Sequence, residues 1–430
     1  MIFSKPTPLT DALRHTLAKK ALALSPDIGS EEIQKHIPAA IRDRAFFSAR
    51  TPYLDYLADT QRDIIRAVQP DTIVEPDGST RPARPGESLS GAEIRSRMKR
   101  RLAALSYKAP AEEEGTLTDL SSDRRLNLII NTQLAQARGY GRWRQSQDPA
   151  VLDLWPAQEL YRAIDKEVPR QWQVRWNEAR ASLGSQTTAS YAETTIGPFV
   201  AKKNDPIWPQ ISAFGNRYAP FDYNSGMRTR DVSRERAEAL GVIKKNETVS
   251  AVHDPMNKAI ELNPRDDTPL DLVESVRSAF ADHALVDESG VLHILPDPVA
   301  TLDELLYRAE QKQQATGAFA FVPDGQRAQL ATTLKRPIPA GATQEIASDR
   351  ITHIFDTHGE GNETRSNQVP IVPADVTALP RLLKDASVRP APPGKPAGSV
   401  ELHSGPYRIA ARYGAKDKRL LIQTMWRMST

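Results

Sequence analysis

The chain has 430 residues, a formal net charge of +3 and a hydrophobic content of 39%. This length suits two or three domains of roughly 100–200 residues each. The 33 prolines favour a modular protein with modest cores and long irregular connections. The absence of cysteine excludes disulfides, thiolate metal sites and a cysteine nucleophile. The small net charge permits a nucleic-acid partner but does not argue for one.

No apolar run approaches the roughly 18–20 residues of a membrane span, so no membrane partner is expected. The stretch Met1 to Pro6 lacks an apolar signal region, which makes Sec export unexpected. We therefore expect a soluble protein that is made in a cytoplasm and at least initially stays there.

The first seventy residues carry apolar side chains at helical spacing. Two rows at i, i+4 spacing predict an N-terminal helical region over residues 1–70, namely Leu9, Leu13 and Leu17, then Ile33, Ile37 and Ile41. Clustered prolines and Asp77-Gly78 predict a linker over residues 71–92. The next predicted helix, Ile94 to Leu105, is basic. Its charges indicate either a solvated helix face or a contact with DNA or an acidic neighbour.

A long helix is expected from Leu117, and it continues as Asn131-Thr132-Gln133 through Gly139-Tyr140-Gly141 to Trp143. A Trp- and Pro-rich block follows, with Trp155-Pro156, Trp172 to Trp176 and Phe214 to Met227. Over about residues 100–245 this pattern resembles the Mu protein F-like (MuF) head-morphogenesis proteins of tailed phages. The resemblance implies a MuF-like domain at 93–245 and a minor head protein of a phage or prophage.

Such a protein would contact the portal and major capsid proteins, and packaged DNA is a further candidate partner. It would reside in the virion, at the capsid interior or portal vertex, after assembly in the bacterial host cytoplasm. Many family members carry His and Cys in this region, whereas this chain has no Cys and no His between residues 37 and 252. We expect aromatic packing to brace the region instead. The alternative is a surface on which single-stranded bases stack. Both interpretations concern Trp172, Trp176, Trp208, Phe214, Tyr218, Phe221 and Tyr223.

The remaining chain is predicted as a small α+β region (246–325), a linker (326–344) and a C-terminal domain (345–430). The last begins with a cluster from Asp349 to His358 that contains two histidines. On a helix over residues 345–358, His353 and His358 would diverge by about 140°. Both could act only if Gly359 ended the helix and swung His358 back. Otherwise one is catalytic and one is structural.

Three antiparallel strands are expected to close the chain. Strict alternation in the last strand puts Thr424 and Trp426 on one face with Leu420, and Met425 on the other face. In the preceding strand, Arg408 and Arg412 share one face. The fold class is therefore α+β, with a mostly helical N-terminal region and a small C-terminal domain of helices on an antiparallel sheet.

The C-terminal layout, with Ile351-Thr352-His353 at its front and Leu420 to Trp426 at its end, resembles the phage nucleases grouped with barnase, EndoU, colicin E5/D and RelE. This resemblance implies a toxin module that cleaves RNA without a metal or other cofactor. Histidine can act as the base or the acid, and a cation can stabilise the phosphorane-like state. The candidate roles are His353 and His358 as acid or base, Arg408 and Arg412 on phosphate, and Thr424 in positioning.

Each of these residues also has a structural interpretation. The arginines suit a solvated strand edge, Thr424 suits sheet packing, and His358 suits a buried, hydrogen-bonded position. One alternative for the whole domain is a non-catalytic module that docks to portal or capsid. Another is an ADP-ribosyltransferase, but no NAD-binding arginine with a Glu-x-Glu pattern occurs in the C-terminal domain.

Overall fold

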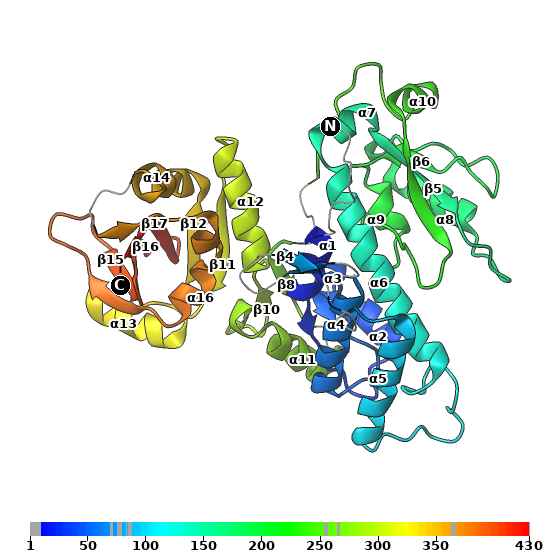
Figure 1. Cartoon of the computed structure of the whole chain (residues 1–430), viewed down its shortest axis with the longest axis horizontal. Coiled ribbons are helices and arrows are strands. Elements are labelled where there is room, and N and C mark those ends of the chain that lie inside the picture. The colour runs from blue at the N-terminus through cyan, green and yellow to red at the C-terminus, as the bar shows by residue number, and fades with distance from the viewer. Residues whose placement is uncertain are drawn as a thin grey trace. The chain divides into compact units, whose positions relative to one another are not determined.

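The computed structural model describes residues 10–68, 72–74, 80–82, 84, 88–252, 257–264, 267–362 and 367–429. Helices and antiparallel sheets make the fold α+β, as predicted (Figure 1). The chain divides into two compact units, Met1–Met256 and Asn257–Thr430. Within the described ranges, no helix combines the length and apolarity needed to cross a membrane.

The first unit begins with helices that share one apolar core. Its elements up to the long helix are α1 (Thr10–Ala18), β1 (Lys20–Ala21), α2 (Ser30–His36), α3 (Ala39–Arg44), β2 (Ala45–Phe46), α4 (Leu54–Val68), β3 (Thr72–Val74), β4 (Thr80–Pro82), α5 (Gly91–Ala104) and α6 (Asp123–Ser146). Buried side chains of α1, α4, α5 and α6 form a single cluster. The predicted boundary between residues 1–70 and 93–245 therefore does not separate two cores.

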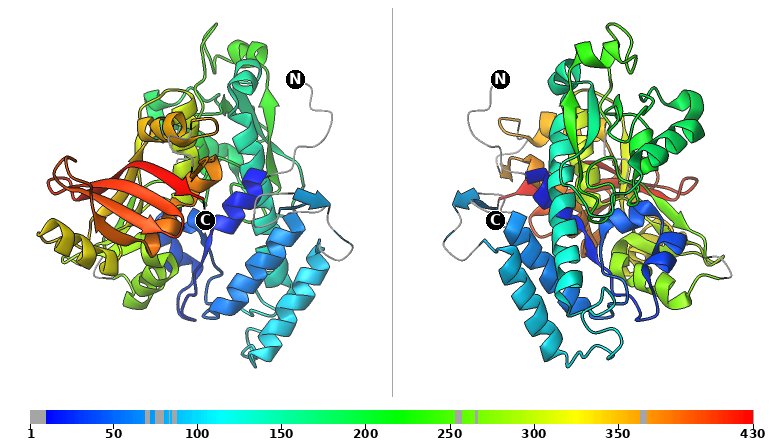
Figure 2. Two further views of the ribbon diagram at one scale, coloured as in Figure 1. Left: turned by 60° about the vertical axis from the view of Figure 1, so that its left-hand side comes forward. Right: turned by 90° about the vertical axis from the view of Figure 1, so that its right-hand side faces the viewer.

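Local sequence signals explain where the two central helices begin. Ser90 and Glu93 form a reciprocal capping box at the start of α5. The Ser122 side chain accepts a hydrogen bond from the backbone N–H of Arg125 at the start of α6. Among the described helices, α6 is the longest with 24 residues, and it runs through the first unit as the cyan helix in Figures 1 and 2. Its buried apolar side chains belong to the cluster shared with α1, α4 and α5 and to a smaller one formed by Tyr140, Trp143 and Tyr218.

A small antiparallel sheet follows α6, within the N-terminal region that we predicted as mostly helical. Strand β5 pairs with β6 on one side and β7 on the other. The elements here are α7 (Pro149–Leu154), β5 (Ala157–Arg162), α8 (Trp172–Leu183), β6 (Val200–Lys202), α9 (Ile207–Ile211), β7 (Met227–Val232) and α10 (Arg234–Ala239). The rings of Trp172, Trp176, Trp208 and Phe221 are buried in one core, which confirms the predicted aromatic packing for these four.

The second unit contains a three-stranded sheet and a seven-stranded sheet. The small sheet has the order β8-β10-β9, and the large one has the order β11-β12-β17-β16-β15-β14, with β13 beside β17. All pairs of the large sheet are antiparallel except β12 with β17. The bounds are β8 (Ile260–Leu262), α11 (Leu270–Phe280), β9 (Ala284–Val286), β10 (Leu292–Ile294), α12 (Pro298–Glu310), β11 (Thr316–Phe321), α13 (Asp324–Leu334), β12 (Thr343–Ala347), α14 (Ser348–His358), β13 (Gln368–Val369), α15 (Pro373–Thr377), α16 (Leu379–Lys384), β14 (Ser387–Pro390), β15 (Ser399–Ser404), β16 (Tyr407–Gly414) and β17 (Arg419–Met428).

The predicted linker at 326–344 is wrong, because α13 occupies most of it and β12 begins at Thr343. Helix α12 and strand β11 belong to the same core as the closing strands. The C-terminal domain therefore starts well before residue 345. The three predicted closing strands are confirmed, and their twisted sheet is visible as the orange and red strands in the left view of Figure 2.

The alternation predicted for the last strand is also wrong beyond residue 422. The β16–β17 register shifts between Ala410 and Ala411, so that Ala410 pairs with Thr424 while Ala411 pairs with Ile422. Gln423 is the extra residue of a bulge. Because one extra residue exchanges the faces of a strand, Met425 joins Leu420 in the core. Thr424 and Trp426 then lie on the opposite face.

Candidate functional site

The histidine cluster lies on α14, and the helix stays regular to its end. His353 is exposed, whereas His358 is 9% exposed, on the side that also buries Ile351 and Ile354. Gly359 follows the helix in an extended conformation. It does not turn the His358 side chain back toward His353. The structure therefore leaves the two histidines apart.

His358 is held against the end of the large sheet. Its Nδ1 lies 3.3 Å from Gln368 Oε1, and its ring centroid lies 5.9 Å from that of Trp426. The His358 carbonyl accepts a hydrogen bond of 2.8 Å from the backbone N–H of Ile371. These contacts agree with the interpretation of His358 as a buried, hydrogen-bonded histidine. They also place it beside strand β17.

The face of β15, β16 and β17 that lies opposite the core gathers polar side chains, and we call it the outer sheet face. Paired residues of neighbouring strands share a face, with Cβ atoms roughly 5 Å apart. The register pairs His403 with Arg408 and Arg408 with Trp426 in one row. The adjacent row pairs Glu401 with Ala410 and Ala410 with Thr424. One row further along, Arg412 pairs with Leu421.

An acid–base pair stands on this face. His403 Nε2 lies 3.2 Å from Glu401 Oε2. The two residues are two apart in β15, so both side chains project away from the buried Val400 and Leu402. Both keep partial exposure, with side-chain accessibilities of 29% for His403 and 21% for Glu401. A carboxylate and an imidazole that remain accessible can exchange protons with a bound ligand.

Cations flank this pair. Arg408 donates from Nη1 to the carbonyls of Gly405 and Tyr407 at 2.8 and 2.9 Å. Arg412 donates from Nε to the carbonyl of Ala397 at 3.3 Å. Within the described ranges, no carboxylate forms an ion pair with either guanidinium. These backbone contacts orient the arginines and leave further N–H donors for an anionic ligand.

Thr424 lies on the same outer sheet face as the predicted arginines. Its Oγ1 is buried, and none of the described groups forms a hydrogen bond with it. Because this oxygen is not accessible, the position suits sheet packing and not contact with a ligand on the outer sheet face.

Four of the five predicted site residues thus meet at or beside one face, and His353 does not. Glu401 and His403 were missed by the sequence analysis. A usable signal existed, because a Glu-x-His pattern in a strand places both side chains on one face. What was lacking was the register that sets them beside Arg408.

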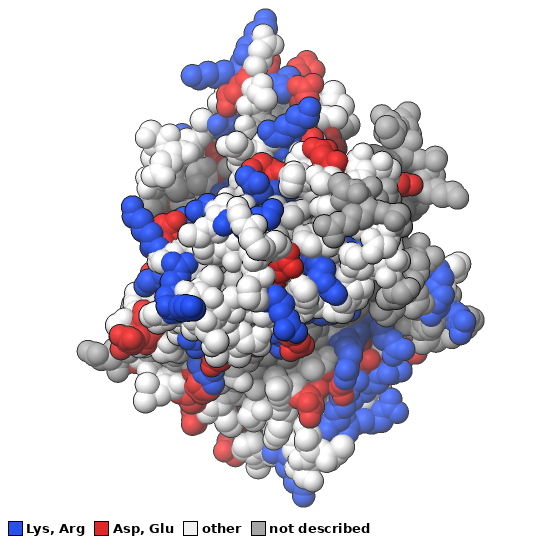
Figure 3. Space-filling model, turned by 90° about the vertical axis from the view of Figure 1, so that its left-hand side faces the viewer, with Lys and Arg blue, Asp and Glu red and all other residues white. Residues whose placement is uncertain are grey.

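The basic helix α5, for which a solvated face and a contact with DNA or an acidic neighbour were both considered, forms ion pairs within its own unit. Arg101 Nη1 and Arg97 Nη1 lie 2.7 and 3.5 Å from the buried Asp63, and Lys99 Nζ lies 2.9 Å from Asp123. This favours the solvated-face interpretation. Positive and negative side chains are interspersed over much of the face shown in Figure 3. The described residues contain no cluster of three or more His, Asp or Glu side chains that could hold a metal ion.

Comparison with known proteins gives no relative for this chain. No protein-family model matches the sequence, and no curated protein matches it. No solved structure matches the fold either. The class of protein must therefore be argued from the residues themselves.

Proposed function

We propose that this chain is a minor head protein of a phage whose C-terminal unit cleaves RNA. The first part of the proposal rests on the resemblance of residues 100–245 to the MuF proteins, with portal, major capsid protein and packaged DNA as partners. The second part rests mainly on one observation, the Glu401–His403 pair beside Arg408 on the outer sheet face. Residence in the virion follows from the first part.

Cleavage through the 2′-hydroxyl needs three groups, and the outer sheet face supplies all of them. Glu401 takes the proton of the 2′-hydroxyl as O2′ attacks phosphorus. His403 gives a proton to O5′ as the P–O5′ bond breaks, which leaves a 2′,3′-cyclic phosphate. Arg408 and Arg412 stabilise the charge that builds on the phosphorane oxygens. Glu401 gains one proton and His403 loses one, so the protons balance between these two residues.

The neighbouring side chains hold the substrate. Trp426 is half-buried next to Arg408 and offers a ring face on which a base can stack. His358 lies against this ring, so it acts as a positioning residue.

The test uses the full chain with end-labelled single-stranded RNA, and DNA of the same sequence. We expect cleavage of RNA only, because DNA lacks the attacking hydroxyl. Glu401→Gln and His403→Ala should each lower the cleavage rate by about 100-fold or more. Arg408→Ala should lower it by a similar factor.

His353→Ala is the matched control, because it removes an exposed imidazole of the same unit that lies away from the outer sheet face. Its rate should stay within about twofold of the parent. Cleavage that survives in both Glu401→Gln and His403→Ala would contradict the assignment. A complete lack of cleavage by the parent chain would favour the docking alternative for this unit.

A further inference from the structure

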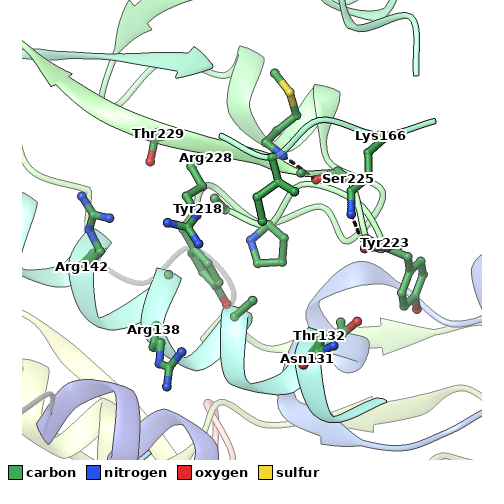
Figure 4. A pocket seen from close by; sticks show the side chains of 18 of the residues that line it. Asn131, Thr132, Arg138, Arg142, Lys166, Tyr218, Tyr223, Ser225, Arg228 and Thr229 are labelled. Carbon is green, nitrogen blue, oxygen red and sulfur yellow. Dashed lines mark hydrogen bonds between the residues drawn. The ribbon is translucent and has the colours of Figure 1, made fainter. Parts of the chain in front are cut away.

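A large groove crosses the first unit between α6 and β7, and its volume is about 1020 Å³. Figure 4 shows Arg138 and Arg142 on α6, Arg228 on β7 opposite, and Tyr218 between the two walls. The segment 218–226 forms the floor that joins them. All lining residues belong to Met1–Met256, so the groove is separate from the outer sheet face.

Two glycines fix the walls of this groove. A Cβ on Gly139 of α6 would lie 1.7 Å from the carbonyl oxygen of Ala219, so only glycine lets segment 218–226 pack onto the helix. Gly226 has a φ of +70°, and a Cβ there would lie 2.3 Å from the Ile164 carbonyl oxygen. The segment is thereby attached to α6 at one end and to the chain that follows β5 at the other. The groove is built into the fold.

The α6 wall is a continuous stripe of the helix. Its members recur at spacings of three and four residues, which places them on one side. The stripe consists of Arg124, Leu128, Asn131, Ala135, Arg138, Arg142 and Ser146. From Arg124 to Ser146 it extends about 33 Å at 1.5 Å per residue.

Cations dominate the charged residues of the lining. Seven side chains are basic, and the one acidic side chain, Asp231, already binds Lys203 at 2.8 Å. Two cations are engaged as well, since Arg170 pairs with Asp222 and Arg230 pairs with Glu159. In the part of the chain that the structure describes, four guanidinium groups of the groove have no carboxylate partner: Arg124, Arg138, Arg142 and Arg228.

We propose that this groove binds a single strand of nucleic acid through its phosphates. Unpaired positive charges facing each other across a cleft repel one another and focus a positive potential into it. A ligand with regularly spaced negative charge relieves that repulsion. Arginine suits this task because its planar fork matches phosphate oxygens bidentately. Asn131, Ser225 and Thr229 add uncharged polar groups along the lining.

The dimensions and the aromatic residues decide which phosphate ligand fits. The groove follows α6 for about 33 Å, so an extended strand can run along it and reach the arginines of both walls. Trp143 and Tyr218 are each 5% exposed and pack with Tyr140, so their ring faces are not free platforms for a base. The strand is therefore held by its backbone, with little dependence on sequence.

The test measures fluorescence anisotropy of a labelled 20-nucleotide oligothymidylate with the full chain. This probe has no 2′-hydroxyl, so the result does not depend on the proposed RNA cleavage. If four arginines contact phosphates, a plot of the logarithm of the association constant against log[salt] should have a slope of about −3. The double variant Arg138→Glu/Arg142→Glu should bind at least tenfold more weakly, with a slope shallower by about 1.4.

Arg144→Glu is the matched control, because it reverses a charge on the same helix outside the groove. Its affinity should remain within about twofold of the parent. Arg228→Glu, on the opposite wall, should weaken binding independently of any damage to α6. Equal affinity of the parent and both groove variants, or no binding at low salt, overturns the proposal. Tighter binding of a 20-residue poly-glutamate peptide, sensitive to the same variants, also overturns it in favour of an acidic polypeptide.

Discussion

Asp43 is a buried carboxylate that holds three parts of the first unit together. Its Oδ1 accepts a 2.7 Å hydrogen bond from the Tyr218 hydroxyl, and its Oδ2 lies 3.6 Å from His15 Nε2. Burial by itself would raise the pKa of Asp43. The nearby charges of His15 and Lys19 and the hydrogen bonds outweigh burial and bring this pKa well below its ordinary value. Burial in turn lowers the pKa of Lys19.

We therefore expect Asp43→Asn to destabilise the first unit by about 3 kcal/mol at neutral pH, because it leaves buried cationic groups without their anion. Urea unfolding at pH 7, followed by tryptophan fluorescence, measures this difference. Asp59→Asn is a suitable control, since Asp59 is a partly exposed carboxylate whose pairs lie at the surface. Asp59→Asn should lower the free energy of unfolding by less than about 1 kcal/mol.

The same carboxylate sets a pH dependence. A carboxyl group whose pKa is lower in the folded than in the unfolded chain stabilises the fold above its unfolded pKa of about 3.9. That contribution is lost as the pH falls through the lower, folded value. The stability difference between the parent and Asp43→Asn should thus be constant from about pH 5 to 7 and shrink below about pH 4. A difference that grows toward acid pH would contradict the assignment of this shift.

At the same scale, the sequence predicted some of the candidate site and missed the rest for identifiable reasons. Arg408 and Arg412 were placed correctly on one face because β16 alternates over its whole length, the extra residue of the bulge being in β17. The spacing of Glu401 and His403 places both side chains on one face of a strand, but the sequence does not show which residues of the neighbouring strand lie beside them. Their relation to Arg408 depends on a hairpin register, which residue types alone do not fix.

At the level of single elements, the bulge at Gln423 is the clearest difference between expectation and structure. Period-two alternation predicted that Thr424 and Trp426 face the same way as Ile422. One inserted residue reverses this, buries Met425 and puts Trp426 next to Arg408. The sequence around Gln423 contains no glycine or proline to mark the irregularity. The sequence therefore predicted that β17 is a strand, but not which face of the sheet its residues after Gln423 occupy.

Gly139 gives a test of how α6 carries the segment 218–226. Glycine to alanine within a helix ordinarily stabilises by up to about 1 kcal/mol. Here the added Cβ would collide with the Ala219 carbonyl, so we expect Gly139→Ala to destabilise the first unit by about 1–3 kcal/mol. Thermal unfolding monitored by circular dichroism shows whether Gly139→Ala raises or lowers the stability of the first unit.

Gly91→Ala serves as the comparison, because its Cβ would meet nothing closer than 3.9 Å at the start of α5. That variant should be neutral or slightly more stable. If Gly139→Ala proved as stable as Gly91→Ala, the close packing of segment 218–226 on α6 would be refuted.

For the whole molecule, the separate cores of the two units have a thermodynamic consequence. The second unit has a core of its own, made by α12 to α16 with the large sheet, and the apolar clusters of the first unit share no residue with it. We expect two unfolding transitions in scanning calorimetry. Asp43→Asn should move only one of them, which identifies the transition of the first unit. A single transition that shifts as a whole would show that the units unfold as one.

The sequence predicted the architecture best where helices are long and amphipathic. The helix predicted from Ile94 to Leu105 corresponds to α5 (Gly91–Ala104), and the helical start of the chain was recognised. The sheet of β5, β6 and β7 was missed because its strands are short and polar on one side. Non-local pairing of such strands is decided by tertiary contacts and not by local periodicity.

The place of β11 in the large sheet determines how the second unit can be divided. Strand β11 covers one side of β12 as its antiparallel neighbour, and α12 packs on both β11 and α14. A fragment beginning at residue 326 or 345 would lack this cover. It would present unpaired backbone N–H and C=O groups at an open sheet edge, which is a template for association with other copies. A fragment beginning at residue 257 keeps β12 paired with β11 and should stay monomeric. Aggregation of a shorter piece would then result from the missing strand and not from an unstable domain.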